Sequence, residues 1–317
     1  MHESLPTLAD IEAARSRISA LARLTPVLRD EALDDEIGAR LFFKCENLQR
    51  VGAFKFRGAC NAVFALDDAA AARGVVTHSS GNHGAALAAA AALRGIAAHV
   101  VVPENANALK LRNIVDAGAT VHRCAPTLAA RETACAAIQR EHGAELVHPY
   151  ADVRVMAGQG TAALELLDQV NGLDAFIAPV GGGGLMSGCA TALRARSRHT
   201  VLVGAEPVGA DDAQRSLAAG RVVPVERPNS ICDGLLATLG EINRVALTTH
   251  RVEVLTVDDA AVRVAMRRLW ERLKLVVEPS SAITYAVLCA HRERFRGQRV
   301  GVLLSGGNVD LDHKPFP

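Results

Sequence analysis

The sequence has almost no excess of charge of either sign, because 35 Lys and Arg residues stand against 34 Asp and Glu residues. It contains no long run of basic residues, which argues against binding to nucleic acid or to an anionic membrane surface. The longest apolar run, at 85–93, is much shorter than the roughly 20 residues that a membrane-spanning helix needs. The N-terminus lacks the apolar segment of a secretory signal peptide. We therefore predict a soluble, cytoplasmic protein that binds neither nucleic acid nor membranes.

Paired cysteines are also missing from the sequence. The seven cysteines are odd in number and scattered, and no two of them form a Cys-x-x-Cys motif. This pattern argues against a disulfide framework and against a structural zinc site. Half of the 317 residues are hydrophobic, so the chain can still form one large domain or two of ordinary size.

Aromatic residues are scarce: the chain has 8 Phe, 2 Tyr and 1 Trp. Lys55 nevertheless lies between Phe54 and Phe56. In apolar surroundings the charged form of a lysine loses hydration, so its pKa falls and the free amine becomes available as a nucleophile. Alternatively, Lys55 lies at an amphipathic edge and extends its ammonium group into water. These three residues alone do not decide between the two interpretations.

Short β-rich segments alternate with alanine-rich segments over most of the chain. We expect strands at 74–78, 97–103, 119–124, 145–149, 174–180, 200–207 and 299–305, and helices at 82–95, 107–118, 127–143 and 185–195. Buried strands separated by helices predict parallel sheets with both faces covered. The segment 74–148 is a candidate for a separate small sheet, which would make the larger domain discontinuous.

Three glycine-containing turns follow predicted strands. The segment 179–188 (PVGGGGLMSG) leads from a strand into a helix, and its glycines leave backbone N–H groups open to an anion such as phosphate. It matches neither the dinucleotide fingerprint nor the ATP P-loop, and a flexible loop is the alternative. The segments 79–84 (SSGNHG) and 303–310 (LLSGGNVD) add hydroxyl and amide groups, although these residues also cap helices. All three turns should meet at one edge of a doubly wound sheet, where ligands bind.

These motifs resemble the serine/threonine dehydratase and serine racemase family of pyridoxal-phosphate enzymes, whose fold type includes the tryptophan synthase β subunit. The segments that carry the resemblance are 42–47, 52–59, 77–84, 157–161, 179–188, 205–207, 232–235, 278–282 and 304–310. The resemblance implies an α/β, fold type II architecture: two doubly wound domains with the cofactor in the cleft between them. The large domain would comprise 1–73 and 152–317, and the small domain 74–151.

The resemblance also implies roles for individual residues. Lys55 would bind pyridoxal 5'-phosphate covalently, and Phe54 would shield that bond. The other cofactor contacts would be Asn82 at the ring oxygen, Gly181, Gly182, Gly183 and Gly184 at the phosphate, and Ser305 at the pyridine nitrogen. The substrate carboxylate would be bound by Ser79, Ser80, Gly81 and Asn82.

The implied reaction is α,β-elimination from L-serine, L-threonine or a related 3-hydroxy amino acid such as threo-3-hydroxyaspartate. Lys55 would remove the Cα proton, and the products would be a 2-oxo acid and ammonia. The alternative is a serine or aspartate racemase, in which Ser80 returns a proton on the opposite face. Ser80 is needed for carboxylate binding in both reactions, so it does not separate them. A non-catalytic binding protein and a β-replacement synthase are further alternatives, which the intact Lys55 and the SSGNHG turn disfavour.

Two positions bear on substrate choice. Arg131 matches a position where racemase-like members carry an arginine near the active-site mouth, and it could bind a second substrate carboxylate. The alternative is a solvated helix arginine. Tyr150 is an aromatic residue near the expected cofactor edge, where relatives vary.

A divalent cation is the second expected cofactor. Glu206 and Asp212 lie six residues apart around a turn after a strand, and the carbonyl of Ala210 could face the same point. Oxygen ligands suit Mg²⁺, and also Mn²⁺ or Ca²⁺. The resemblance supports this site, whereas a capped acidic turn is the alternative. The resemblance also suggests a homodimer.

Overall fold

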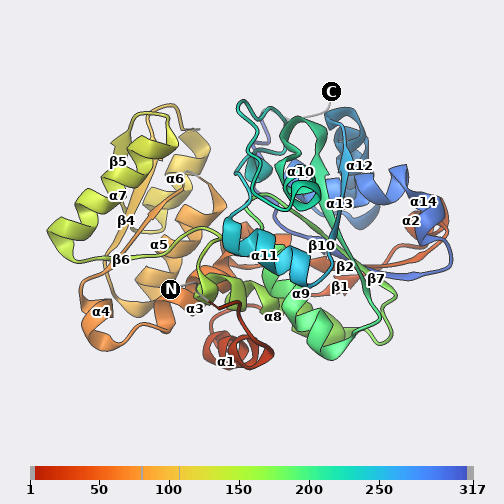
Figure 1. The fold of residues 1–317 in the computed structure, drawn as a ribbon, viewed down its shortest axis with the longest axis horizontal. Coiled ribbons are helices and arrows are strands. Elements are labelled where there is room, and N and C mark those ends of the chain that lie inside the picture. Colours follow the sequence, from red (N-terminus) through yellow and green to blue (C-terminus); the bar gives the residue numbers. More distant parts are fainter. Residues whose placement is uncertain (1–3, 80, 107, 313–317) are drawn as a thin grey trace.

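The computed structural model describes residues 4–79, 81–106 and 108–312, which form two helix-covered sheets lying side by side (Figure 1). The larger sheet has the spatial order β1 (Val27–Leu28), β2 (Arg40–Cys45), β10 (Arg299–Leu304), β7 (Ala175–Pro179), β8 (Val201–Pro207) and β9 (Glu253–Val257). The smaller sheet has the order β5 (Thr120–Cys124), β4 (Ala98–Pro103), β3 (Val75–His78) and β6 (Glu145–Leu146). Within the described residues, no helix has both the length and the apolar composition needed to cross a bilayer.

The helices cover the faces of both sheets. They are α1 (Leu8–Ile18), α2 (Glu31–Ile37), α3 (Lys55–Phe64), α4 (Asp68–Ala72), α5 (Asn82–Arg94), α6 (Ala108–Asp116), α7 (Leu128–His142), α8 (Val153–Gln169), α9 (Gly184–Arg196), α10 (Asp212–Ala219), α11 (Glu241–Thr249), α12 (Asp259–Leu273), α13 (Pro279–Ala290) and α14 (Arg292–Phe295). Short 3-10 helices are η1 (Glu46–Leu48), η2 (Arg50–Gly52), η3 (Val208–Ala210) and η4 (Asp233–Leu235). The expected helix end at Gly143 is confirmed, because that residue adopts φ +68°, which glycine tolerates without strain.

The prediction of parallel sheets is confirmed, with one exception. All neighbouring strands named above are parallel apart from β1 and β2, which pair antiparallel. An antiparallel edge strand on an otherwise parallel sheet is common, and β1 has only two residues, too few to give a sequence pattern. β6 is shorter than expected: the amide of Val147 still bonds to the Val76 carbonyl, but Pro149 has no N–H with which to extend the ladder.

The two sheets are formed by different parts of the chain. Every strand of the smaller sheet lies between residues 75 and 146, and the larger sheet is built from segments before and after them. We propose 74–151 as the small domain and 1–73 with 152–317 as the large domain.

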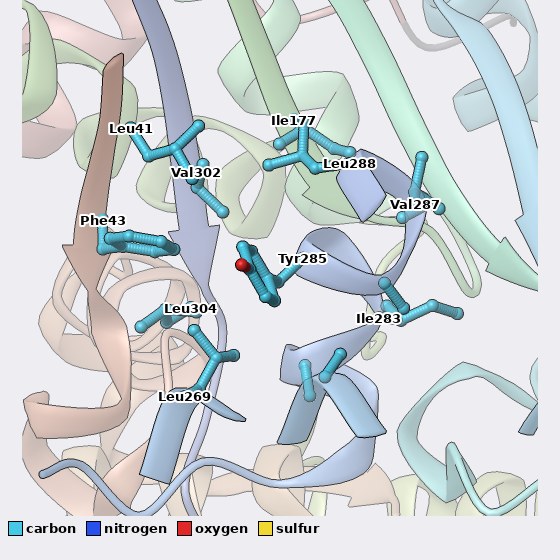
Figure 2. Close-up of a cluster of buried hydrophobic side chains, with 14 of the residues drawn as sticks. Leu41, Phe43, Ile177, Leu269, Ile283, Tyr285, Val287, Leu288, Val302 and Leu304 are labelled. Carbon is cyan, nitrogen blue, oxygen red and sulfur yellow. The ribbon is translucent and has the colours of Figure 1, made fainter. Parts of the chain in front are cut away.

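One hydrophobic core of the large domain lies between its sheet and helices α12 and α13, and a second contains residues of α8 and α9. Figure 2 shows Tyr285 of α13 projecting toward strands β2 and β10, with its ring centroid 6.2 Å from that of Phe43. The Tyr285 hydroxyl donates to Glu36 at 2.6 Å, which satisfies the one polar atom of this side chain. The apolar side chains labelled around it are Leu41, Ile177, Leu269, Ile283, Val287, Leu288, Val302 and Leu304.

A buried ionic network ties α3 to β2, η1 and α8. The guanidinium of Arg57 donates to both carboxylate oxygens of Glu46 and both of Glu165, at 2.7–2.8 Å. Lys44, fully buried in β2, adds a bond to Glu165 at 2.7 Å. Burial raises the pKa of Glu46, but the Arg57 charge outweighs it and holds that pKa below its usual value. The network fixes the helix that begins at Lys55.

Replacing Glu46 with glutamine should therefore lower the free energy of unfolding by about 3–5 kcal/mol, because it leaves Arg57 without one of its two buried partners. Urea denaturation measures the change. The matched control is Glu12→Gln, which removes an exposed pair with Arg196 and should cost less than about 1 kcal/mol. Equal losses in the two variants would contradict this description of the network.

Candidate active site

A cavity of about 650 Å³ lies between the two sheets. The carboxyl ends of β3, β7 and β10 and the start of α3 form its walls, which is the edge where doubly wound proteins bind ligands. The predicted site residues that line it are Phe54, Lys55, Ser79, Gly81, Asn82, Arg131, Gly181, Gly182, Gly183, Gly184 and Ser305. Tyr150 lines it as well. Ser80 lies outside the described residues.

Lys55 is the first residue of α3 and extends its amine into this cavity. Its Nζ donates to the carbonyl of Pro149 at 2.8 Å and lies 5.3 Å from the centre of the Phe54 ring. Burial lowers the pKa of Lys55 from 10.5 to about 8, while the Glu278 charge acts in the opposite direction. Phe56, the other aromatic neighbour, is fully buried in the core instead. A substantial fraction of the Lys55 amine is therefore neutral near physiological pH.

Two helices point glycine-capped N-termini at the same cavity. The N-cap of α9 is Gly183, in a left-handed conformation with φ +93°, and the N-cap of α5 is Gly81. Glycine has no side chain to bond the first-turn amides, so the partial positive charge of each helix end stays available to an anion. A Cβ atom on Gly182 would lie 2.4 Å from the Tyr150 ring, so no larger residue fits there. The cavity can accept two anionic groups, such as a phosphate and a carboxylate.

Asn82 is held in place from two sides. Its Nδ2 donates to Glu278 at 2.9 Å, and its Oδ1 accepts from Asn308 at 2.8 Å. Glu278 lines the cavity and acts electrostatically on Lys55, yet sequence analysis treated it only as part of a motif. Nothing in the local sequence marks it, because its partner Asn82 is 196 positions away.

Ser305 stands where β10 ends. It is 2% exposed, and its carbonyl accepts a hydrogen bond from the amide of Phe54 at 2.9 Å. This bond couples the end of the central strand to the turn that carries Lys55.

His148, in the turn at 148–151, is a second residue that sequence analysis missed. His148 accepts the amide of Ala151 at its Nδ1 at 2.9 Å, and its ring packs edge-on against Tyr150 with 4.6 Å between centroids. Burial lowers the pKa of His148 to about 4, so the ring is neutral and free to accept at Nδ1. The turn presents the Pro149 carbonyl to Lys55 and the Tyr150 ring to the glycine loop.

Arg131 reaches the cavity from α7. Its Nε donates to the Thr127 carbonyl at 3.3 Å within the same helix. The Arg131 charge contributes to a lowered pKa of His78, after the larger effect of burial. A cation is therefore present on the small-domain wall.

The expected metal ligands lie outside the cavity wall. Glu206, at the end of β8, accepts the amides of Ala213 and Gln214 at 2.8 and 2.9 Å, and Asp212 accepts the amide of Leu239 at 2.6 Å. Burial raises the pKa of Glu206 to about 8 and that of Asp212 to about 6. The capped-turn arrangement is thus present. In the described part of the chain, no three or more His, Cys, Asp or Glu side chains are arranged to hold a metal ion.

The chain is similar in sequence and in structure to several known enzymes. The chain is 47% identical over 312 residues to beta-hydroxyaspartate dehydratase of Paracoccus denitrificans, covering 98% of this chain and 99% of the relative. It is 42% identical to L-threo-3-hydroxyaspartate ammonia-lyase of Saccharomyces cerevisiae, covering 97% and 94%. Maize serine racemase superposes with a TM-score of 0.96 at 42% identity, covering 98% of this chain and 95% of the other. The family model described as pyridoxal-phosphate dependent enzyme matches residues 18–306, and the chain belongs to that family.

Proposed function

We propose that the protein is a pyridoxal-phosphate-dependent dehydratase (ammonia-lyase) that acts on 3-hydroxy amino acids, with 3-hydroxyaspartate as the preferred substrate. The observation that carries the proposal is the Lys55 amine, whose pKa is lowered to about 8, in a cavity onto which two glycine-capped helix ends open. An available amine and two anion sites fit a phosphorylated aldehyde cofactor together with an amino-acid carboxylate.

The cofactor contacts are proposed from the family resemblance, for residues that line the cavity. Lys55 would attach the cofactor, Phe54 would shield the attachment, and Asn82 would bond the ring oxygen. The amides of residues 181–184 bind the phosphate at the α9 N-terminus. When bound, the cofactor supplies an electron sink for the charge that develops at the substrate Cα. Ser305 would offer the ring nitrogen a neutral hydroxyl rather than a carboxylate, which favours rapid elimination.

The chain's own groups perform the remaining steps. The α5 N-terminus, with Ser79, Gly81 and Asn82, binds the substrate α-carboxylate; Ser80 is assigned the same role from the sequence alone. Lys55, as a neutral amine, would take the Cα proton as general base. The β-hydroxyl would leave with a proton as water, giving an enamine, and one water molecule would hydrolyse the imine tautomer of that enamine to the 2-oxo acid and ammonia. The Pro149 carbonyl accepts a hydrogen bond from the Lys55 amine and so orients it in the cavity.

Arg131 supports a substrate with a second carboxylate. It stands on the small-domain wall of the cavity, where a guanidinium can pair with the β-carboxylate of 3-hydroxyaspartate. Two relatives whose names state hydroxyaspartate activity agree with this choice. Tyr150, packed against the glycine loop, borders the same space.

A racemase activity is the second candidate, because a serine racemase shares the fold so closely. One assay separates the two reactions. Holoenzyme is given L-serine, and both pyruvate and D-serine are quantified over time. We expect pyruvate and ammonia in equal amounts, with D-serine as a minor product. D-serine formed faster than pyruvate would contradict the dehydratase proposal and support the racemase.

The rate at which apoenzyme binds pyridoxal phosphate should depend on pH through Lys55. Only the neutral amine attacks an aldehyde, so the rate should rise with pH to a midpoint near 8 and then level off. Stopped-flow absorbance of the cofactor measures this profile. Glu278→Gln removes a charge that favours protonated Lys55, so its midpoint should lie lower. A midpoint near 10.5 in the wild type would contradict the buried-amine account.

We also propose that Glu206, Asp212 and the carbonyl of Ala210 bind a divalent cation, Mg²⁺ or alternatively Mn²⁺ or Ca²⁺. The two carboxylates are buried, and Asp212 adds to the raised pKa of Glu206, so a cation would relieve an unfavourable concentration of charge. The ion would stabilise the turn between β8 and α10, away from the reacting groups.

We further propose a homodimer in the cytoplasm, as the family resemblance suggests. Size-exclusion chromatography with light scattering tests the assembly.

Saturating Mg²⁺ should raise the melting temperature of the wild type by about 5 °C or more, because the ion binds only the folded state. The increase should grow as pH rises through about 8, since the ion competes with the proton on Glu206. In Glu206→Gln the increase should vanish, whereas Glu241→Gln, an exposed control, should retain it. An unchanged Mg²⁺ effect in Glu206→Gln would rule out this site.

A further inference from the structure

Three histidines gather on the small domain, outside the cavity described above. They are His99 of β4, His122 of β5 and His142 at the end of α7. The Nδ1 of His99 lies 3.0 Å from the Nε2 of His122, and the ring of His142 stacks on that of His99 with 4.6 Å between centroids and 13° between planes. Glu141 lies beside His142, with 3.7 Å between its carboxylate and the ring nitrogen. We call these four residues the histidine cluster.

The register of the small sheet creates the cluster. His122 pairs with Val101 across the β4–β5 ladder, and His99 lies two residues before Val101, so His99 and His122 are diagonal neighbours on one face. That face is covered by α7, whose residue Ile138 packs near Val101. α7 runs back along the sheet and brings His142 over His99. None of these histidines lines the cavity, so the cluster is separate from the catalytic machinery.

We propose that the histidine cluster binds a late first-row divalent metal, Zn²⁺ or Cu²⁺, through His99 Nδ1 and His122 Nε2. Two nitrogens bound to one tetrahedral zinc ion at about 2.0–2.1 Å lie roughly 3.3–3.4 Å apart, so the two rings, now at hydrogen-bond distance of 3.0 Å, need to separate by only a few tenths of an ångström to admit the ion. Imidazole is a preferred ligand of these metals. Because three ligands do not already converge among the described residues, His142 or Glu141 must turn inward, or water must fill the other positions.

The surroundings favour a cation at this point. His142 is 39% exposed and Glu141 is 73% exposed at their side chains, so both have room to reorient. The cluster lies at the C-terminus of α7, where the helix dipole attracts positive charge. A pair that shares one proton without metal is the competing description.

The test is metal titration of the holoenzyme, with Zn²⁺ measured by calorimetry and Cu²⁺ by electron paramagnetic resonance. We expect a Cu²⁺ spectrum with nitrogen coupling from at least two imidazoles, which the carboxylates of the Glu206 site would not give. His99→Gln and His122→Gln should each weaken Zn²⁺ binding at this site about tenfold or more. His142→Gln, an exposed substitution that leaves the core untouched, should weaken it less.

Controls keep the outcome unambiguous. His199→Gln changes an exposed histidine of the large domain and should leave the titration unchanged. Circular dichroism identifies any variant that does not fold, in which case the Cu²⁺ spectrum of the wild type remains decisive. Zn²⁺ affinity unaffected by both His99→Gln and His122→Gln, or a Cu²⁺ spectrum without imidazole coupling, would overturn the proposal and leave a proton-sharing pair. The result is independent of catalysis, because no outcome depends on turnover.

Discussion

Replacing Lys55 with alanine should lower the rate of 2-oxo acid formation by about 10⁴-fold, because the variant loses both the cofactor attachment and the general base. The visible absorption of the attached cofactor should disappear from the purified variant as well. A coupled assay for the oxo acid at saturating pyridoxal phosphate measures the first effect, and a spectrum measures the second. The variant can still bind some cofactor non-covalently, because the contacts from the glycine loop remain.

A chemical rescue experiment separates catalysis from folding. A small primary amine added to Lys55→Ala should restore part of the activity, because it can occupy the space of the missing side chain and accept a proton. Lys274→Gln changes an exposed lysine and should behave as wild type. Full activity in Lys55→Ala would show that another group performs the reaction.

Replacing Arg131 with glutamine should change the choice of substrate. We expect kcat/KM for threo-3-hydroxyaspartate to fall about 10- to 100-fold, the effect of losing one charge-assisted contact to the β-carboxylate. For L-serine, which has no β-carboxylate, kcat/KM should change less than about threefold. Steady-state kinetics on both substrates provides the comparison.

The matched control for Arg131 lies on the same helix. Arg140 is an exposed residue of α7 that does not line the cavity, and Arg140→Gln should leave both substrates unaffected. Equal losses on the two substrates in Arg131→Gln would mean that the arginine only maintains structure. No loss on either substrate would mean that it remains solvated, the alternative that the sequence left open.

The arrangement of the cavity could be predicted because it depends on local patterns. Each glycine turn follows a buried strand, and parallel strands bring their carboxyl ends to one edge. The turns at 79–84, 179–188 and 303–310 all reach the cavity for this reason. The lowered pKa of Lys55 could also be anticipated from its apolar neighbours, although only Phe54 lies beside the amine.

Contacts between distant parts of the chain could not be predicted in the same way. β2 contains Lys44, a charge that is atypical of a buried strand and that is explained by bonds of its amine to distant groups, among them Glu165 and Gln169 of α8. Glu278 is tied to Asn82, 196 positions away, by a bond that no spacing rule indicates. These interactions depend on register and packing rather than on periodicity.

The histidine cluster shows the same limit. His99 and His122 are 23 positions apart, which matches no short metal-binding motif. Only the pairing of β4 with β5 makes them neighbours.

The measurement that tests the central claim most directly is kcat/KM for 2-oxo acid formation by the wild-type holoenzyme on four substrates. These are the threo and erythro forms of L-3-hydroxyaspartate, L-serine and L-threonine, assayed with Mg²⁺ present. We predict formation of a 2-oxo acid and ammonia, fastest from one of the 3-hydroxyaspartates. Conversion of L-serine to D-serine, without oxo acid from any of the four substrates, would contradict the account.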